Sequence, residues 1–192
     1  MKFEKFIDLL MEMPEASYFY LDSSLYKKDS INGNRMSFNN IIQEYSSFYY
    51  THFKNLTVYK ISSNEKTEYY FLDLSKKIYV GNFIIKKDYR TKFPRLDSIW
   101  KYKNYDKDTG SDILLNFILT EFSSIESSSI HSKQAQNFWI KTLHLAQSKG
   151  YKISFVNVST NTENSVQNAQ ELENWIKHAW NNSDVVPRIY AK

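Results

Sequence analysis

The residues best placed to do chemistry stand in one segment, residues 97–119, which reads DSIWKYKNYDKDTGSDILLNFIL. The pattern predicts a strand, a short basic turn and a helix. N–H groups at a helix start lack partners and the helix dipole is positive there, so such a junction can bind an anion. Lys107 adds a cation, and Gly110 lets a ligand approach the backbone. Alternatively, Gly110 is an ordinary turn glycine and Asp112 an ordinary N-cap, because strand–turn–helix junctions are common.

A second segment, residues 131–151, reads HSKQAQNFWIKTLHLAQSKGY and predicts a helix that Gly150 ends. Together the two segments resemble the GNAT family of N-acetyltransferases, particularly its compact and divergent phage members. That family has a pyrophosphate turn, Q/R-x-x-G-x-G/A, after its fourth strand. The matching residues here are Lys107, Asp108, Thr109, Gly110, Ser111 and Asp112. The family's later N-x-x-A-x-x-x-Y pattern is matched in spacing by Ser132, Ala135 and Trp139, and Gly150–Tyr151 match its Gly-aromatic pair.

The resemblance covers residues 57–158 and implies a protein that transfers an acetyl group from acetyl-CoA to an amine. In the family, main-chain groups of the fourth strand bind the pantetheine arm, which implies Ile99, Trp100 and Lys101 here. The general base often lies on that strand or its neighbours. The residues that the resemblance implies for acid–base work are Asp97 as base, with Asp73 and Asp88 as alternatives, and Tyr151 as acid, with Tyr102 and Tyr105 as alternatives.

Three departures from the family pattern support a second hypothesis. Asp112 stands where the family has Gly or Ala, and a carboxylate there repels a pyrophosphate unless it points away. Trp139 replaces a tyrosine that protonates the leaving thiolate, and indole is a poor acid. Ser132 replaces an asparagine. The second hypothesis is a catalytically inactive acetyltransferase fold that binds a host protein, as an inhibitor encoded by a phage or mobile element.

Composition excludes several other functions. The 192 residues include no cysteine, so disulfides, thiolate metal sites and cysteine nucleophiles are excluded. Aromatic residues make up 17% of the chain, which favours a packed core. The net charge of +4 is mild and the lysines are scattered, so we expect no nucleic-acid partner. Without an apolar run long enough for a bilayer or a secretory signal, we expect no membrane partner and a cytoplasmic location, in the host if a phage encodes the chain.

The elements that must position these residues follow from hydrophobic periodicity. Helices are predicted over residues 3–13, 38–53, 112–122, 131–148 and 167–180, and strands over residues 57–62, 68–73, 78–86, 97–103, 124–128, 151–158 and 185–190. Residues 15–36, with a turn at Asn32-Gly33-Asn34, and residues 159–166 are predicted to be irregular. Gly81 inside a strand indicates a bulge or a close backbone approach.

This order predicts an α+β fold of GNAT type with a single mixed or antiparallel sheet flanked by helices. Residues 1–56 are predicted to form an N-terminal helical appendage, and residues 57–192 an acetyltransferase-like core with a C-terminal helix and strand. We expect the helices of the appendage to cover the sheet or to form a homodimer or partner surface.

Overall fold

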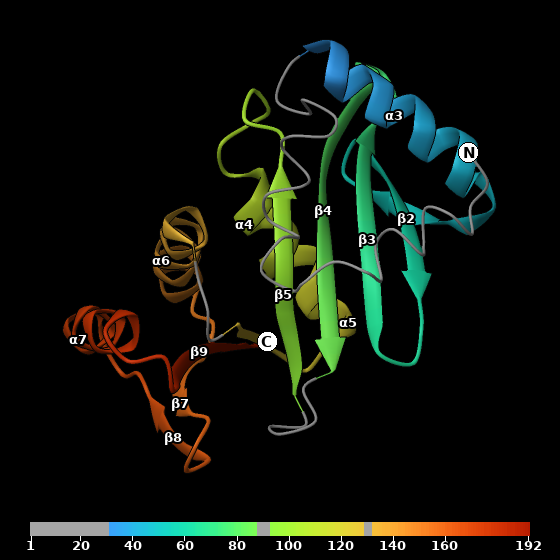
Figure 1. Cartoon of the computed structure of the whole chain (residues 1–192). Helices are drawn as coiled ribbons and strands as arrows, with labels where there is room; N and C mark the ends of the chain where they lie inside the picture. Colours follow the sequence, from blue (N-terminus) through green and yellow to red (C-terminus); the bar gives the residue numbers. More distant parts are fainter. Residues whose placement is uncertain (1–30, 88–92, 129–131) are drawn as a thin grey trace.

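The computed structural model describes residues 31–87, 93–128 and 132–192 (Figure 1). Its centre is a nine-stranded sheet of order β1-β2-β3-β4-β5-β6-β9-β7-β8. The strands are β1 (Tyr49–Phe53), β2 (Leu56–Ser62), β3 (Lys66–Asp73), β4 (Ile78–Lys87), β5 (Pro94–Lys101), β6 (Ser124–Ser127), β7 (Ile153–Asn157), β8 (Thr162–Ser165) and β9 (Val185–Tyr190). Neighbouring strands are antiparallel except β5 and β6, which are parallel. The predicted single mixed sheet is confirmed.

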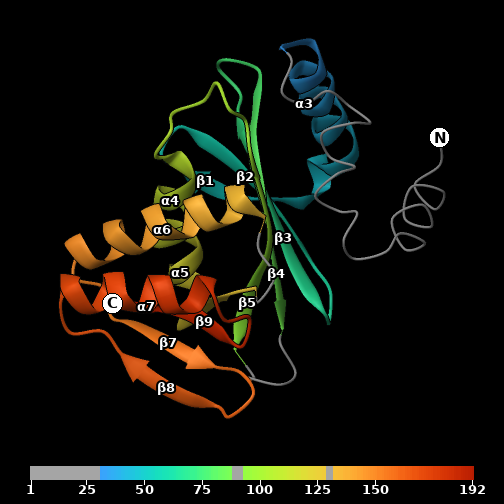
Figure 2. The ribbon, with the colours of Figure 1, turned by 60° about the vertical axis from the view of Figure 1, so that its left-hand side comes forward.

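Helices cover both faces of this sheet. They are α3 (Ile31–Tyr45), the short η2 (Ser46–Phe48), α4 (Thr109–Ile113), the π-helical segment η3 (Leu114–Ile118), α5 (Leu119–Glu121), α6 (Lys133–Ser148) and α7 (Ala169–Trp180). Figure 2 shows α3 on one face and α4 to α7 on the other. The larger core lies under α4 to α7, and a smaller aromatic core lies under α3.

The strands predicted between residues 57 and 103 are confirmed as β2 to β5. Their β-branched and aromatic residues alternate between the two cores, as in a sheet covered on both faces. Lys54 and Lys77 have φ values of 55° and 54°, at the turns before β2 and β4. These turns fix the register of the meander.

A bulge in β4 explains how α3 is fastened to the sheet. Phe71 pairs with Gly81 and Leu72 with Tyr79, so one extra residue of β4 interrupts the ladder. The buried Asn34 side chain accepts from the Tyr79 N–H at 3.0 Å and donates to the Tyr79 carbonyl at 2.7 Å. The close approach expected at Gly81 is confirmed, because a Cβ there would lie 2.5 Å from the Trp100 carbonyl oxygen.

Two predictions near the start of the described chain are wrong. The turn expected at Asn32-Gly33-Asn34 lies inside α3, where the contacts of Asn34 with β4 outweigh the local turn preference. The helix predicted over residues 38–53 ends at Tyr45, and β1 follows it. Its aromatic spacing also suits a strand, and pairing with β2 decides the outcome. The helix predicted over residues 3–13 lies outside the described residues.

The elements after β5 follow the prediction with one exception. The helices predicted over residues 131–148 and 167–180 are α6 and α7, and Gly150 has φ 73° in the expected cap role after α6. The helix predicted over residues 112–122 is confirmed as α4, η3 and α5. Residues 159–166 are not wholly irregular, because β8 forms there by pairing with β7. All four β8 residues are exposed, so no apolar alternation marks this strand.

No helix within the described ranges is both long and apolar enough to cross a membrane.

Candidate functional site

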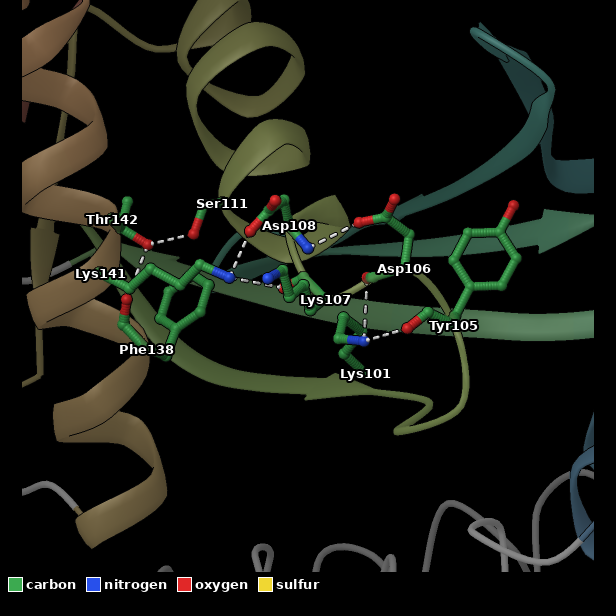
Figure 3. Close-up of polar contacts among 9 residues, drawn as sticks. All are labelled: Lys101, Tyr105, Asp106, Lys107, Asp108, Ser111, Phe138, Lys141 and Thr142. Carbon is green, nitrogen blue, oxygen red and sulfur yellow. Dashed lines mark hydrogen bonds and ion pairs between the residues drawn. The ribbon is translucent and has the colours of Figure 1, made fainter.

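The turn between β5 and α4 is organised around the ammonium group of Lys101, the last residue of β5 (Figure 3). Its Nζ donates to three main-chain oxygens of the turn, those of Tyr102 at 3.0 Å, Tyr105 at 3.1 Å and Asp106 at 3.1 Å. Burial lowers the pKa of this amine, while the negative charge of Asp106 opposes that shift. Lys101 therefore fixes the conformation of the turn by binding three of its carbonyl groups.

The start of α4 is held by Asp106. Its carboxylate accepts from the Asp108 N–H at 2.7 Å, and its carbonyl accepts from the Thr109 N–H at 3.2 Å. The N-cap position belongs to Asp108, whose side chain makes no capping bond. The alternative that Asp112 is the N-cap is therefore wrong, because Asp112 N–H already donates to the Asp108 carbonyl at 3.0 Å inside the helix.

Helix α6 is joined to this turn by three polar contacts (Figure 3). Lys141 forms an ion pair with Asp108 and donates to the Lys107 carbonyl at 3.0 Å. The hydroxyl groups of Ser111 and Thr142 lie 2.8 Å apart and are buried. The predicted turn residues Lys107, Asp108 and Ser111 are thus brought together, by a helix that follows them in the chain.

Gly110 permits close packing at the start of α4. A Cβ there would lie 3.3 Å from the Phe138 ring, 3.6 Å from the Lys101 side chain and 3.8 Å from Ile99. A larger residue would push Phe138 away, so α4, α6 and β5 approach one another at this glycine. The N–H groups of Gly110 and Ser111 lie in the first helical turn, where they have no intrahelical partner.

The carboxylate of Asp112 is directed away from the turn. It accepts from Lys54 of the β1–β2 hairpin at 2.5 Å and from Asn116 at 2.5 Å. Lys54 neutralises its charge, and the contact joins α4 to the edge of the sheet. The repulsion expected between Asp112 and a bound pyrophosphate is reduced by this geometry.

The junction of β5 and β6 is short in the described part of the chain. Within it, Arg95 and Leu96 are the β5 residues that pair with β6. Leu96 pairs with Ile85 and Ser98 with Ile84 on the other side, so Asp97 is the extra residue of a bulge. Beyond Leu96, no described strand lies on the β6-facing side of Ile99. The edge of an extended strand can accept a further strand or an amide-rich ligand.

Asp97, the predicted base, is held by two cations. Its carboxylate lies 3.0 Å from Lys86 Nζ and 3.1 Å from an Arg95 guanidinium nitrogen. It directly follows the two β5 residues that pair with β6, whereas Lys101 is the last residue of β5. At about 3.3 Å per residue, these two positions are roughly 13 Å apart.

Tyr151, the predicted acid, lies against the π-helical segment. Its hydroxyl donates to the Leu115 carbonyl at 2.9 Å and to Asn116 Oδ1 at 3.3 Å. Burial raises its pKa, and the charge of Asp112 adds to the shift. Tyr151 and Asp97 have no partner in common. The alternative acid Tyr102 is 4% exposed and lies in the turn itself.

The three residues predicted on α6 have separate roles. Ser132 is the N-cap of α6, and its hydroxyl accepts from the Ala135 N–H at 3.2 Å. Trp139 is 2% exposed and belongs to the larger core. Ala135 is buried as well. Trp139 stabilises the packing of α6 rather than facing the turn.

Asp73, an alternative base, supports the turn from the meander. Its fully buried carboxylate accepts from the hydroxyls of Ser75 at 2.6 Å and Tyr105 at 2.9 Å, from the Lys76 N–H at 3.1 Å and from Asn55 at 3.2 Å. Burial alone would raise its pKa, but the bonds from Ser75, Lys76 and Tyr105 outweigh that effect and lower it. Asp88, the other alternative, lies outside the described residues.

No protein-family model matches this sequence, and no curated protein matches it either.

Sequence reasoning missed the α6 residues that complete the site. Phe138, Lys141 and Thr142 follow the i, i+3, i+4 spacing of one helix face, and that spacing was the available signal. The result is a turn with Lys101, Lys107 and Lys141 around it, beside the β6-facing edge of β5. Such a site can hold a ligand that has an anionic end and an extended arm with amide groups. Among the described residues, no three His, Asp or Glu side chains form a group that could hold a metal ion.

Proposed function

We propose that this protein is a GNAT-like N-acetyltransferase that binds acetyl-CoA between β5 and β6 and transfers the acetyl group to an amine. The observation that carries the proposal is the short β5–β6 junction, where two residue pairs of the described chain join the strands. The edge of β5 beyond these pairs leads to the turn organised around Lys101.

The order of the elements supports this proposal. A helix precedes an antiparallel meander, β2 to β5, and then α4 to α5 cross over to β6, which is parallel to β5. Helix α6 and the antiparallel strands β7 and β9 follow, with β9 between β6 and β7. This arrangement resembles the one that the sequence resemblance implies for residues 57–158.

The chemistry of coenzyme A fits the two parts of the site. Its pantetheine arm is extended and carries two amides, which can pair with the β6-facing edge of β5 at Ile99 as an added strand does. Its pyrophosphate would lie at the turn, beside the ammonium groups of Lys107 and Lys141. Asp112 does not oppose this arrangement, because its carboxylate faces Lys54.

Asp97 is the residue we propose as the base. An arm that enters at the turn and follows the edge of β5 ends near the bulge at Asp97. A carboxylate there can take the proton of the attacking amine as the new amide bond forms and the thiolate leaves. The hydroxyl of Tyr151 is bonded to Leu115, so it would have to leave this partner to protonate the thiolate.

Calorimetric titration with acetyl-CoA tests the proposal. We expect saturable binding to the full chain and at least roughly tenfold weaker binding to Lys107→Glu, because the reversal places a carboxylate beside the pyrophosphate. Lys177→Glu makes the same charge change on the exposed surface of α7 and should bind like the unaltered protein. Absence of any binding at millimolar acetyl-CoA would contradict the proposal.

A second function, binding of a host protein, is favoured by the exposed aromatic residues around β1. Phe48, Tyr49 and Tyr50 are 43%, 52% and 44% exposed, and β1 is an edge strand of the described sheet. Clusters of exposed aromatics are typical of protein interfaces. Capture of one stoichiometric host protein that is lost in Tyr49→Ser/Tyr50→Ser, by a chain that binds no acetyl-CoA, would favour this function over the first.

A further inference from the structure

Asp108 places a negative charge among Lys101, Lys107 and Lys141, next to a second carboxylate, that of Asp106. Its carboxylate forms an ion pair with Lys141 of α6, and Lys107 and Lys101 lie close enough to influence it. The hydrogen bond from Lys141, which is the largest effect, and the two further lysines lower the pKa of Asp108. The carboxylate is therefore ionised at neutral pH.

Lys141 is fully engaged by the turn in this arrangement. Its ammonium group contacts the Asp108 carboxylate and also donates to the Lys107 carbonyl at 3.0 Å (Figure 3). The side chains of Lys141 and Asp108 are 42% and 56% exposed, so solvent and ligands can reach both. Exposed ion pairs contribute little to stability, so this pair can open and close at small cost.

We propose that Asp108 is an intramolecular competitor of the ligand, whose carboxylate occupies the position on Lys141 that a phosphate group takes when the ligand binds. The inference rests on the proposed function and adds a residue that determines affinity at the same site. Ligands that carry a pyrophosphate displace the carboxylate, because a phosphate offers more negative charge and more acceptor oxygens to the same ammonium group. Ligands without phosphate cannot make this exchange.

The surroundings of the pair favour an exchange over a rearrangement of the fold. The Asp108 N–H and carbonyl are bonded to Asp106 and Asp112, so the main chain keeps its position when the side chain turns away. The main chain of Lys141 is held in α6 next to Thr142. The Thr142 hydroxyl is hydrogen-bonded to Ser111 and to the Phe138 carbonyl. Only two exposed side-chain ends have to move.

The variants Asp108→Asn and Lys141→Gln distinguish the effects of the two residues on ligand affinity. We expect Asp108→Asn to bind acetyl-CoA about tenfold more tightly, because the ammonium group of Lys141 is then available to the phosphate. Lys141→Gln should bind about tenfold more weakly, and the double variant should bind as weakly as Lys141→Gln alone, because Asp108 acts through Lys141. Inorganic pyrophosphate should show the same ranking.

Glu173→Gln is the matched control. It removes one negative charge from an exposed pair with His144, whose Nε2 lies 3.2 Å away on α6. Affinity should be unchanged in this variant, and all variants should keep the thermal unfolding midpoint of the unaltered chain within a few degrees.

The outcomes distinguish the two proposals. If the unaltered chain binds acetyl-CoA and Asp108→Asn binds no more tightly, the competitor role is overturned while the proposed function stands. If Asp108→Asn binds and the unaltered chain does not bind at millimolar acetyl-CoA, the competitor role is supported, whereas the proposed function of the unaltered chain is contradicted. If neither binds acetyl-CoA at millimolar concentration, the proposed function fails and the competitor role fails with it.

Discussion

The two halves of the sheet are built by different means. From β1 to β5, consecutive strands pair along most of their length, and aromatic side chains fill both faces. In the other half, which consists of β6, β9, β7 and β8, the strands are short and charged side chains are buried between the strands and helices. Arg188 of β9 is 2% exposed and pairs with Glu126 and Glu163, and the Phe93 ring lies 3.7 Å from its guanidinium carbon.

The difference shows where a ligand can enter. In the meander each hairpin sets the register of the next strand, and the bulges in it displace single residues without separating the strands. The second half is connected to it by crossovers and, within the described residues, by two residue pairs between β5 and β6. The proposed cofactor site lies at this boundary, between a half stabilised mainly by apolar packing and a half that depends on buried charge.

Loss of the buried charge pair should have the largest effect on stability. We expect Arg188→Met to lower the free energy of unfolding by about 4 kcal/mol, because it leaves the buried Glu126 carboxylate without a cation. Urea unfolding measures this loss. The double variant Arg188→Met/Glu126→Leu should regain much of the stability, whereas equal losses in both variants would show that the second half does not depend on charge.

Asp73→Asn should weaken the meander half by about 3 kcal/mol at neutral pH, because a buried carboxylate with four donors is replaced by an amide. The pKa of Asp73 is lowered in the folded protein, so its contribution is complete above the ordinary carboxyl pKa and is lost as pH falls through the lowered value. The difference between the two proteins should therefore shrink below about pH 4.

Unfolding at a series of pH values, followed by circular dichroism, checks this prediction. Asp184→Asn, at an exposed position, is the matched control and should change little at any pH. A constant difference between Asp73→Asn and the unaltered chain down to about pH 2 would contradict the assigned role.

Asn34→Ala should have the smallest effect of the three, a loss of about 2 kcal/mol, because it leaves the Tyr79 N–H and carbonyl at the β4 bulge without their side-chain partner. Chemical denaturation measures the loss. Asn39→Ala, on the exposed side of the same helix, should cost nothing. Equal stability of the two variants would mean that α3 is not fastened to the meander through this amide.

Local patterns predicted most of the fold. The meander was evident because β-branched and aromatic runs alternate with short polar turns, and Gly150 marked the end of α6. The failures have a common cause, which is pairing with a distant segment. Residues 49–53 form a strand because they pair with β2. Asn34 lies in a helix, where its side chain bonds to the main chain of Tyr79. The exposed residues of β8 form a strand because they pair with β7.

The candidate site was predictable only in its local part. Lys107 and Gly110 were found because a strand, a turn and a helix follow one another in the sequence. Lys141 and Phe138 lie some thirty residues later, and their helical spacing places them on one face of α6 without indicating that this face contacts the turn. How far β6 pairs with β5 is a property of the tertiary structure.

Hydrogen exchange of the full chain with and without acetyl-CoA tests the central claim most directly. Bound ligand should slow exchange in peptides that cover residues 97–101 and 107–111, because the arm pairs with the edge of β5 and the phosphates bind at the turn. Peptides from β2 and β3 should be unaffected. Protection confined to other segments, or no change at a saturating concentration, would contradict a cofactor site at the boundary between the two halves.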